Sequence, residues 1–125
     1  MIVDTNGLSH RSEGDLRIRD LVAGSGGVEI PAMVLGEDRF GIAQSRQREG
    51  HERWLRNVLS RFRVLNITDE TSIWYADVRL ELKRTGKPIP TNDLWIAALC
   101  RQHNLPLLSR DRHFDLVAGL RRIGW

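Results

Sequence analysis

Short apolar runs alternate along the chain with longer segments of helical periodicity. The apolar runs are rich in Ile, Val and Leu, as buried strands are. Five strands are predicted, at residues 1–5, 28–30, 64–67, 105–108 and 120–125. Between the strands, apolar residues at helical spacing predict helices at residues 15–23, 49–62 and 93–103. Two further helices are predicted to begin after Pro31 and after a cap at Thr68 or Asp69. This alternation predicts an α/β fold with a central, mainly parallel five-stranded sheet and helices on both faces.

Turn-forming residues mark where these elements end. Residues 4–7, Asp-Thr-Asn-Gly, read as a turn after the first strand, and Gly24 and Gly86 end the helices before them. Thr91 or Asn92 is expected to cap the helix from 93. Residues 114–119 are expected to form a turn or short helix, and the stripe of Trp54, Leu55, Val58 and Leu59 is expected to be core or the wall of a groove.

The length of 125 residues predicts one domain, residues 1–125, with a hydrophobic content of 41% that suffices for a core. Of the 19 basic residues 17 are Arg, which favours an anionic partner such as a phosphate backbone, although a solvated basic surface fits equally. The single Cys100 is expected to be buried. No leader opens the chain, and the longest apolar run, residues 94–100, is too short to cross a bilayer. A cytoplasmic protein that does not engage a membrane is therefore expected.

Acidic residues fall where the predicted topology brings them to one edge of the sheet. Asp4 follows the first strand and Asp111 follows the fourth, while Glu37 and Asp93 lie in the early turns of two helices. In open parallel sheets, ligands bind at this edge. Each acid alone has a structural explanation as a turn, cap or loop residue. Their joint placement predicts a cluster of carboxylates, which would repel one another without a cation.

Oxygen ligands without His or Cys select Mg²⁺ or Mn²⁺, and such a site suits phosphodiester hydrolysis by a metal-activated water. Thr5, Asn6 and Ser109 are candidates to support the carboxylates, and Asp115 is a further ligand or a surface acid. The four histidines, His10, His51, His103 and His113, lack the spacing of a zinc site. Phosphate-binding, dinucleotide-binding and serine-hydrolase motifs are absent from the sequence.

Three segments, IVDTNGLS, PAMVLGEDRFGI and IPTNDLWIAALCRQHNLPLLSRDRHFD, carry a resemblance that covers essentially the whole chain. The sequence resembles a PIN-domain ribonuclease, specifically a VapC-type toxin. That resemblance implies a PIN-like three-layer fold with five parallel strands and a Mg²⁺- or Mn²⁺-dependent endoribonuclease. It also implies a homodimer and a cognate VapB-type antitoxin whose segment fills a groove near the site.

The resemblance also carries residue roles onto this chain. The acidic quartet that binds metal in the family maps onto Asp4, Glu37, Asp93 and Asp111, and Asn6 and Ser109 match its polar residues. In the family, an apolar residue usually follows the glutamate, whereas this sequence has Asp38 there. Either Glu37 or Asp38 could therefore face the metal, and the spacing of the residues that follow favours Glu37.

Arg110 and Arg112 are the best-placed residues to bind the RNA backbone. Two other functions fit the same residues. One is a catalytically idle PIN-like module that binds RNA or a protein partner, and the other is a metal-dependent phosphatase acting on small phosphoesters.

Overall fold

The computed structural model describes residues 1–12 and 14–125, with only the backbone described at 10–12. His10, one of the four histidines considered above, therefore lies outside the described side chains. Five strands and six α-helices alternate in the described residues, together with one short 3-10 helix, η1. Their bounds are β1 Ile2–Val3, α1 Thr5–Ser12, α2 Leu16–Ala23, β2 Glu29–Pro31, α3 Ala32–Gln44, α4 Arg48–Leu59, β3 Arg63–Leu65, α5 Asp69–Arg84, α6 Thr91–His103, β4 Leu107–Leu108, η1 Arg112–Leu116 and β5 Arg122–Ile123.

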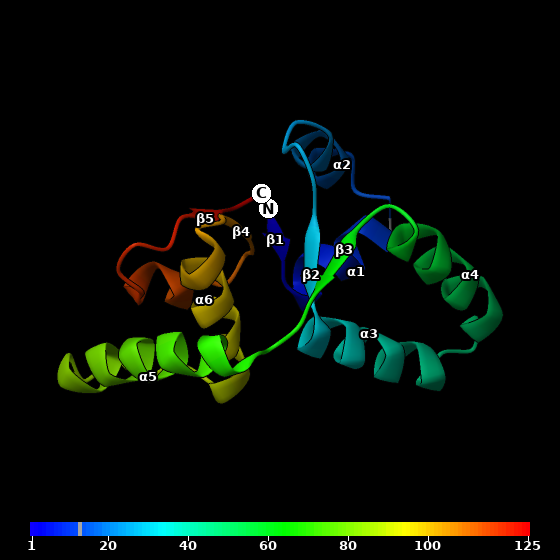
Figure 1. Ribbon diagram of the computed structural model, residues 1–125. Coiled ribbons are helices and arrows are strands. Elements are labelled where there is room, and N and C mark those ends of the chain that lie inside the picture. Colours follow the sequence, from blue (N-terminus) through cyan, green and yellow to red (C-terminus); the bar gives the residue numbers. More distant parts are fainter. Residues whose placement is uncertain (13) are drawn as a thin grey trace.

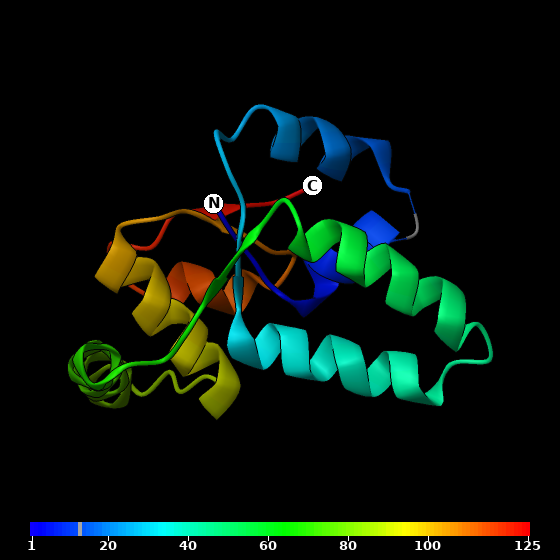
Figure 2. The ribbon, with the colours of Figure 1, turned by 45° about the vertical axis from the view of Figure 1, so that its right-hand side comes forward.

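The five strands form one sheet in the order β3-β2-β1-β4-β5, and every pair is parallel. The predicted α/β fold with a five-stranded parallel sheet is confirmed. In Figure 1, α3 and α4 lie on the right, toward the β3 edge of the sheet, and α5 and α6 lie on the left, toward its β4 and β5 strands. Figure 2 shows the same two groups from another side, with α5 seen end-on and packed against α6. β1 lies in the middle of the sheet, so its carboxyl end opens between the two groups of helices.

The central strands and α6 supply much of the buried core. Ile2, Leu107 and Leu108 have no exposed surface, and α6 buries a continuous run from Ile96 to Cys100. Cys100 is buried as expected, and burial raises its pKa to about 12, so the thiol stays protonated. Within the described residues, no helix combines the length and apolar character needed to cross a bilayer.

The structure corrects two local predictions near the sheet edge. Residues 4–7 do not form an isolated turn, because α1 begins at Thr5 directly after β1. This polar helix is held in place by Leu8, which is buried, and by Gly7, which packs close to Val3. α6 begins at Thr91 with Pro90 as its N-cap residue, so neither Thr91 nor Asn92 caps it.

The other helices begin and end for reasons that are visible in the sequence. The side chain of Asp15 accepts a hydrogen bond from the Arg17 backbone at the start of α2. Thr68 and Thr71 form a reciprocal cap at the start of α5. Of the α4 stripe, Leu55 and Val58 are buried core residues. Trp54 and Leu59 are half-buried and pack against that core.

Candidate active site

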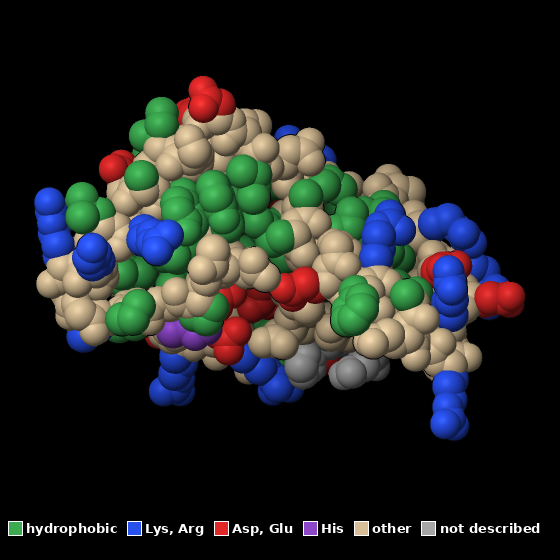
Figure 3. Space-filling view, turned by 90° about the horizontal axis from the view of Figure 1, so that it is seen from below, with side chains coloured by type: hydrophobic (Ala, Val, Ile, Leu, Met, Phe, Trp, Pro, Cys, Tyr) green, Lys and Arg blue, Asp and Glu red, His purple; other side chains and the backbone are tan. Residues whose placement is uncertain are grey.

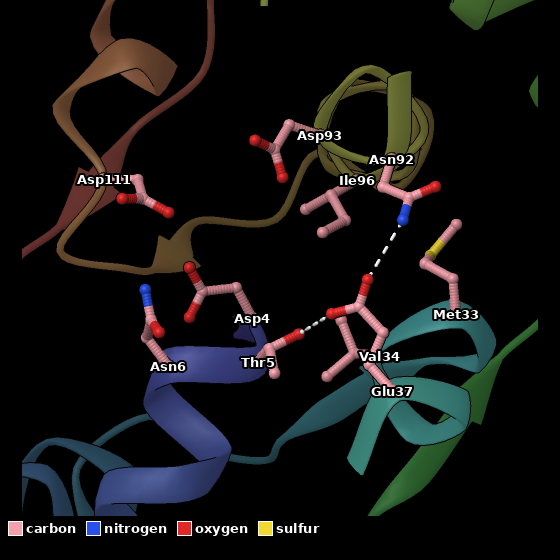
Figure 4. A pocket seen from close by; sticks show the side chains of 10 residues that line it. All are labelled: Asp4, Thr5, Asn6, Met33, Val34, Glu37, Asn92, Asp93, Ile96 and Asp111. Atoms are coloured by element: carbon pink, nitrogen blue, oxygen red, sulfur yellow. Dashed lines mark hydrogen bonds between the residues drawn. The ribbon is translucent and has the colours of Figure 1, made fainter. Parts of the chain in front are cut away.

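A pocket of about 230 Å³ opens at the carboxyl ends of β1 and β4, between α1, α3 and α6. All four predicted acids line it, and we call it the acid pocket. Its lining residues are Asp4, Thr5, Asn6, Met33, Val34, Glu37, Asn92, Asp93, Ile96 and Asp111. In the close-up of Figure 4, the carboxylates of Asp4, Asp93 and Asp111 surround a common space, and Glu37 lies across from them on α3. Figure 3 shows acidic side chains gathered in a hollow on this face, with a histidine beside it.

Asp4 is the most deeply placed of the four acids. Its side chain follows β1 directly, and the residue is only 4% exposed. One carboxylate oxygen accepts the backbone N–H of Gly7 at 2.9 Å, and the other accepts the hydroxyl of Ser109. Burial raises the pKa of Asp4, and the charges of Asp111 and Asp93 add to the rise, whereas the two hydrogen bonds oppose it. Among the described residues, the hydrogen bonds to Asp4 come from neutral donors and include no positive partner.

Glu37 reaches the pocket from α3 and is held at both oxygens. The hydroxyl of Thr5 donates to one oxygen at 2.8 Å, and the side-chain amide of Asn92 donates to the other at 3.0 Å. Asp38 is not among the residues that line the pocket. One of its oxygens, Oδ2, is buried without a hydrogen-bond partner, and burial raises its pKa. Of the two neighbouring acids, Glu37 faces the pocket.

Asp93 lies in the first turn of α6, where its charge suits the helix dipole. Its Oδ2 atom is 2.7 Å from Nε2 of His113, an ion-pair distance, although the ring is not aligned for a hydrogen bond. Burial raises the pKa of Asp93, and Asp111 and Glu37 add to the rise, while His113 opposes it. In the sequence, His113 was considered as a zinc ligand and was given no role at this site.

The remaining predicted residues divide between the pocket and its surroundings. Asn6 lines the pocket, while Ser109 lies behind it and contacts Asp4. The backbone N–H of Asp111 donates to the Ser109 hydroxyl at 3.0 Å, which places this loop against β1. Asp115 does not line the pocket and instead forms a two-pronged ion pair with Arg122.

Arg110 and Arg112 are exposed, and each is next to Asp111 in the chain. Among residues that the sequence reasoning missed, Asn92 had one available signal: it directly precedes Asp93 at the start of the same helix.

The donor set of the acid pocket fits a hard divalent cation. Four carboxylates line it, with no Cys or His among the lining residues. Within the described residues, no group of three or more Asp, Glu, His or Cys side chains is arranged closely enough to make a preformed metal site. Burial is the main cause of the raised pKa values of Asp4 and Asp93, and the neighbouring carboxylates add to it, so a positive charge here would favour their ionised forms.

Comparisons with known proteins agree with this fold. The family model for the PIN domain matches residues 1–120. Ribonuclease VapC2 of Rickettsia felis is 27% identical over 107 residues, which cover 85% of this chain and 80% of the relative. A crystal structure of VapBC2 from Rickettsia felis, bound to a DNA fragment from their promoter, matches with a TM-score of 0.85 at 25% identity, covering 99% of this chain and 97% of that one.

A more distant structure is VapBC-5 of Mycobacterium tuberculosis, described as a member of the VapBC family of toxin-antitoxin systems. It matches with a TM-score of 0.67 at 26% identity, over 78% of this chain and 82% of that one. The match to the family covers almost the whole chain, including all four acids of the pocket. The chain belongs to the PIN domain family, and VapC-type proteins are among its relatives.

Proposed function

We propose that this protein is an endoribonuclease of the VapC type that depends on Mg²⁺ or Mn²⁺ and hydrolyses RNA phosphodiester bonds in the cytoplasm. The observation that carries the proposal is the meeting of Asp4, Glu37, Asp93 and Asp111 in one pocket, although they are far apart in the sequence. The similarity to a ribonuclease of this type supports the choice of RNA as substrate.

Asp4, Asp93 and Asp111, with Glu37, would hold the cation. When bound, it supplies a Lewis acid that polarises a phosphodiester and makes water a better nucleophile. The chain's own residues set the geometry. Ser109 and the Gly7 backbone donate to the two oxygens of Asp4 and oppose the rise in its pKa, and Thr5 and Asn92 hold both oxygens of Glu37.

Other side chains orient the substrate around these acids. Asn6 is exposed at the mouth of the acid pocket, where its amide is placed to orient water or a phosphate oxygen. Arg110 and Arg112 flank Asp111 and supply positive charge for the RNA backbone. These contacts position the strand and carry no base preference.

The decisive experiment is cleavage of total RNA by the purified protein with Mg²⁺, with Mn²⁺ and with EDTA. Wild type is compared with Asp93→Asn, and Asp77→Asn is the matched control, because Asp77 is an exposed acid of α5 outside the acid pocket. Metal-dependent fragments from wild type and Asp77→Asn, and none from Asp93→Asn, are expected. Intact RNA from folded wild type with either metal would refute the proposal.

The same assay separates the competing functions. An idle binding module would retain RNA without cutting it, and a phosphatase would turn over a small aryl phosphate while it leaves RNA intact. Asp93→Asn removes one charge but keeps the size of the side chain, so a failure to fold is not expected to explain lost activity. Circular dichroism of each variant checks this point.

We further propose that the protein pairs with a VapB-type antitoxin and forms a homodimer, as a VapC-type toxin would. A shallow groove between α2 and α4 offers one place for a partner segment. It is lined by Gly14, Asp15, Leu16, Arg19 and Trp54. Leu16 is 61% exposed there, which is unusual for a large apolar side chain.

Co-expression with the neighbouring reading frame, followed by size-exclusion chromatography with light scattering, tests both partners. Leu16→Glu is expected to weaken the toxin–antitoxin complex. Leu80→Glu, which changes an exposed leucine of α5 outside the groove, is the control. A complex equally stable in both variants would place the antitoxin elsewhere.

A further inference from the structure

A second pocket, of about 490 Å³, lies beside the acid pocket, where the loop after β4 meets the end of β5. We call it the arginine pocket. Its lining residues are Arg110, Arg112, Arg122, Gly124 and Trp125. Three guanidinium groups at one pocket repel one another unless an anion is bound, and Asp115 is the acid that is paired with one of them. This second concentration of charge has the opposite sign to the acid pocket.

Arg122 is held as a rigid donor. Its Nε and Nη2 atoms donate to the two oxygens of Asp115 at 2.9 Å and 3.0 Å, and Nη1 donates to the backbone carbonyl of Ser109 at 3.1 Å. Because a guanidinium carries five N–H groups, two remain for a ligand after these three bonds. A side chain at Gly124 would meet Arg122 at 2.9 Å, so the glycine lets the guanidinium lie against the backbone.

Arg110 is held in a different way. Its guanidinium carbon lies 4.9 Å from the centre of the Trp125 ring, a cation–π contact that restrains a long side chain without neutralising it. Arg112 is exposed at the start of η1, and its guanidinium forms no ion pair with any described residue. Among the described contacts, neither Arg110 nor Arg112 is in a close ion pair, although the charge of Arg112 also helps to lower the pKa of Asp115.

The two pockets are joined through a single short segment. The hydroxyl of Ser109 donates to Asp4 in the acid pocket, while its carbonyl accepts from Arg122 in the arginine pocket. Asp111 lines the acid pocket, and its chain neighbours Arg110 and Arg112 line the other. The segment from Ser109 to Arg112 therefore belongs to both pockets.

We propose that the arginine pocket is a phosphate subsite, which binds a backbone phosphodiester of the RNA next to the one cut at the acid pocket. Arginine suits this role because its planar fork can hold two phosphate oxygens at once. Asp115 and Trp125 are positioning residues that act through Arg122 and Arg110. The identity of the strand as substrate rests on the proposed function, but the binding of phosphate does not.

Binding is measured in EDTA, where no cleavage occurs, by fluorescence anisotropy of a labelled single-stranded RNA over a series of salt concentrations. Arg112→Ala is compared with Arg56→Ala, which removes an exposed arginine of α4 outside both pockets. Loss of one phosphate contact is expected to reduce the slope of log affinity against log salt by about 0.7. Arg56→Ala is expected to leave the slope unchanged.

A second set of variants tests the positioning role of the tryptophan. Trp125→Leu removes no charge, yet it is expected to weaken RNA binding several-fold, and Trp125→Phe should restore most of the loss. If Trp125 acts through Arg110, adding Trp125→Leu to Arg110→Ala should have little further effect. Thermal melts of each variant exclude unfolding as the cause.

Several results would overturn the subsite. One such result is an equal slope of log affinity against log salt for Arg112→Ala and Arg56→Ala. Another is that the losses of RNA affinity caused by Arg110→Ala and Trp125→Leu simply add. If the variants of the arginine pocket bind the antitoxin more weakly but bind RNA as the wild type does, the pocket belongs to a protein partner instead. Cleavage by wild type without the binding pattern would leave the nuclease intact and reject the subsite. The binding pattern without any cleavage by wild type would support the subsite and reject the nuclease.

Discussion

The hydrogen bond from Ser109 to Asp4 offers the sharpest test of how the acid pocket is held together. Ser109 is fully buried, and its hydroxyl has two partners: it donates to Asp4 and accepts the backbone N–H of Asp111. Ser109→Ala would leave Asp4 with the Gly7 N–H as its one remaining donor among the described contacts, and would orphan the Asp111 N–H. The change removes one oxygen atom and adds no bulk.

The expected cost follows from those two losses. A hydrogen bond to a buried carboxylate contributes about 1.5–3 kcal/mol, and an unpaired backbone N–H costs roughly 1 kcal/mol more when it is partly buried. We expect Ser109→Ala to lower the free energy of unfolding by about 3 kcal/mol at neutral pH, measured by urea denaturation in EDTA. Because the lost bond lowers the pKa of Asp4, the deficit should shrink as acid protonates the carboxyl group.

A double-mutant cycle with Asp4→Asn provides the control. The asparagine has no charge to stabilise, so Ser109→Ala should cost only about 1–2 kcal/mol in that background. The coupling energy between the two positions is therefore expected to exceed about 1 kcal/mol. If the costs of the two changes simply add, the hydroxyl does not stabilise the charge of Asp4, and this account of the site is wrong.

Four other measurements test the fold and the pocket. Gly7→Ala is expected to destabilise by about 1–3 kcal/mol in urea, because the added carbon would lie 2.7 Å from Val3, whereas Gly36→Ala on open α3 should stabilise slightly. Mg²⁺ should raise the melting temperature more at neutral than at mildly acidic pH. Carboxyl groups with raised pKa values favour folding in full only below their unfolded pKa, and they lose that contribution as the pH rises through their folded pKa. Mg²⁺ therefore has the larger stabilising effect at neutral pH, where these groups are ionised. His113→Ala should weaken Mn²⁺ binding about tenfold by calorimetry, with partial recovery in His113→Gln. Asp111→Asn should stabilise the metal-free protein in thermal melts, and a loss of stability would argue against repulsion among the acids.

Local sequence patterns predicted the elements whose signals lie within a few residues. The buried helix α6 follows from its apolar run, and the start of α5 follows from Thr68. Helix α1 could not be predicted this way, because Asp, Asn and Gly favour turns, and among its described side chains Leu8 is the large apolar one that is buried. Tertiary packing against β1 decides its conformation, and the sequence pattern contains no sign of that contact.

The meeting of the acids was predictable from topology, but their supports were not. Parallel strands bring the ends of β1 and β4 to one edge, so Asp4 and Asp111 had to be near each other. The bond from Asn92 to Glu37 joins residues 55 positions apart on two helices, and nothing local signals it. It became possible because α6 starts at Thr91, which puts Asn92 inside the helix at the rim of the pocket.

The supports of the four acids are unequal, and the inequality indicates where ligand binding has the largest effect. The carboxylates of Asp4 and Glu37 each accept hydrogen bonds, and that of Asp93 lies 2.7 Å from the ring nitrogen Nε2 of His113. Within the described contacts, the carboxylate of Asp111 forms no hydrogen bond or ion pair, although two arginines flank it in the chain. Asp111 therefore lies at the boundary between the acid and arginine pockets, and its carboxylate oxygens have no partner among the described contacts. A cation on one side and an RNA phosphate on the other would both act on this residue, so under the proposed function its position would couple metal binding to substrate binding.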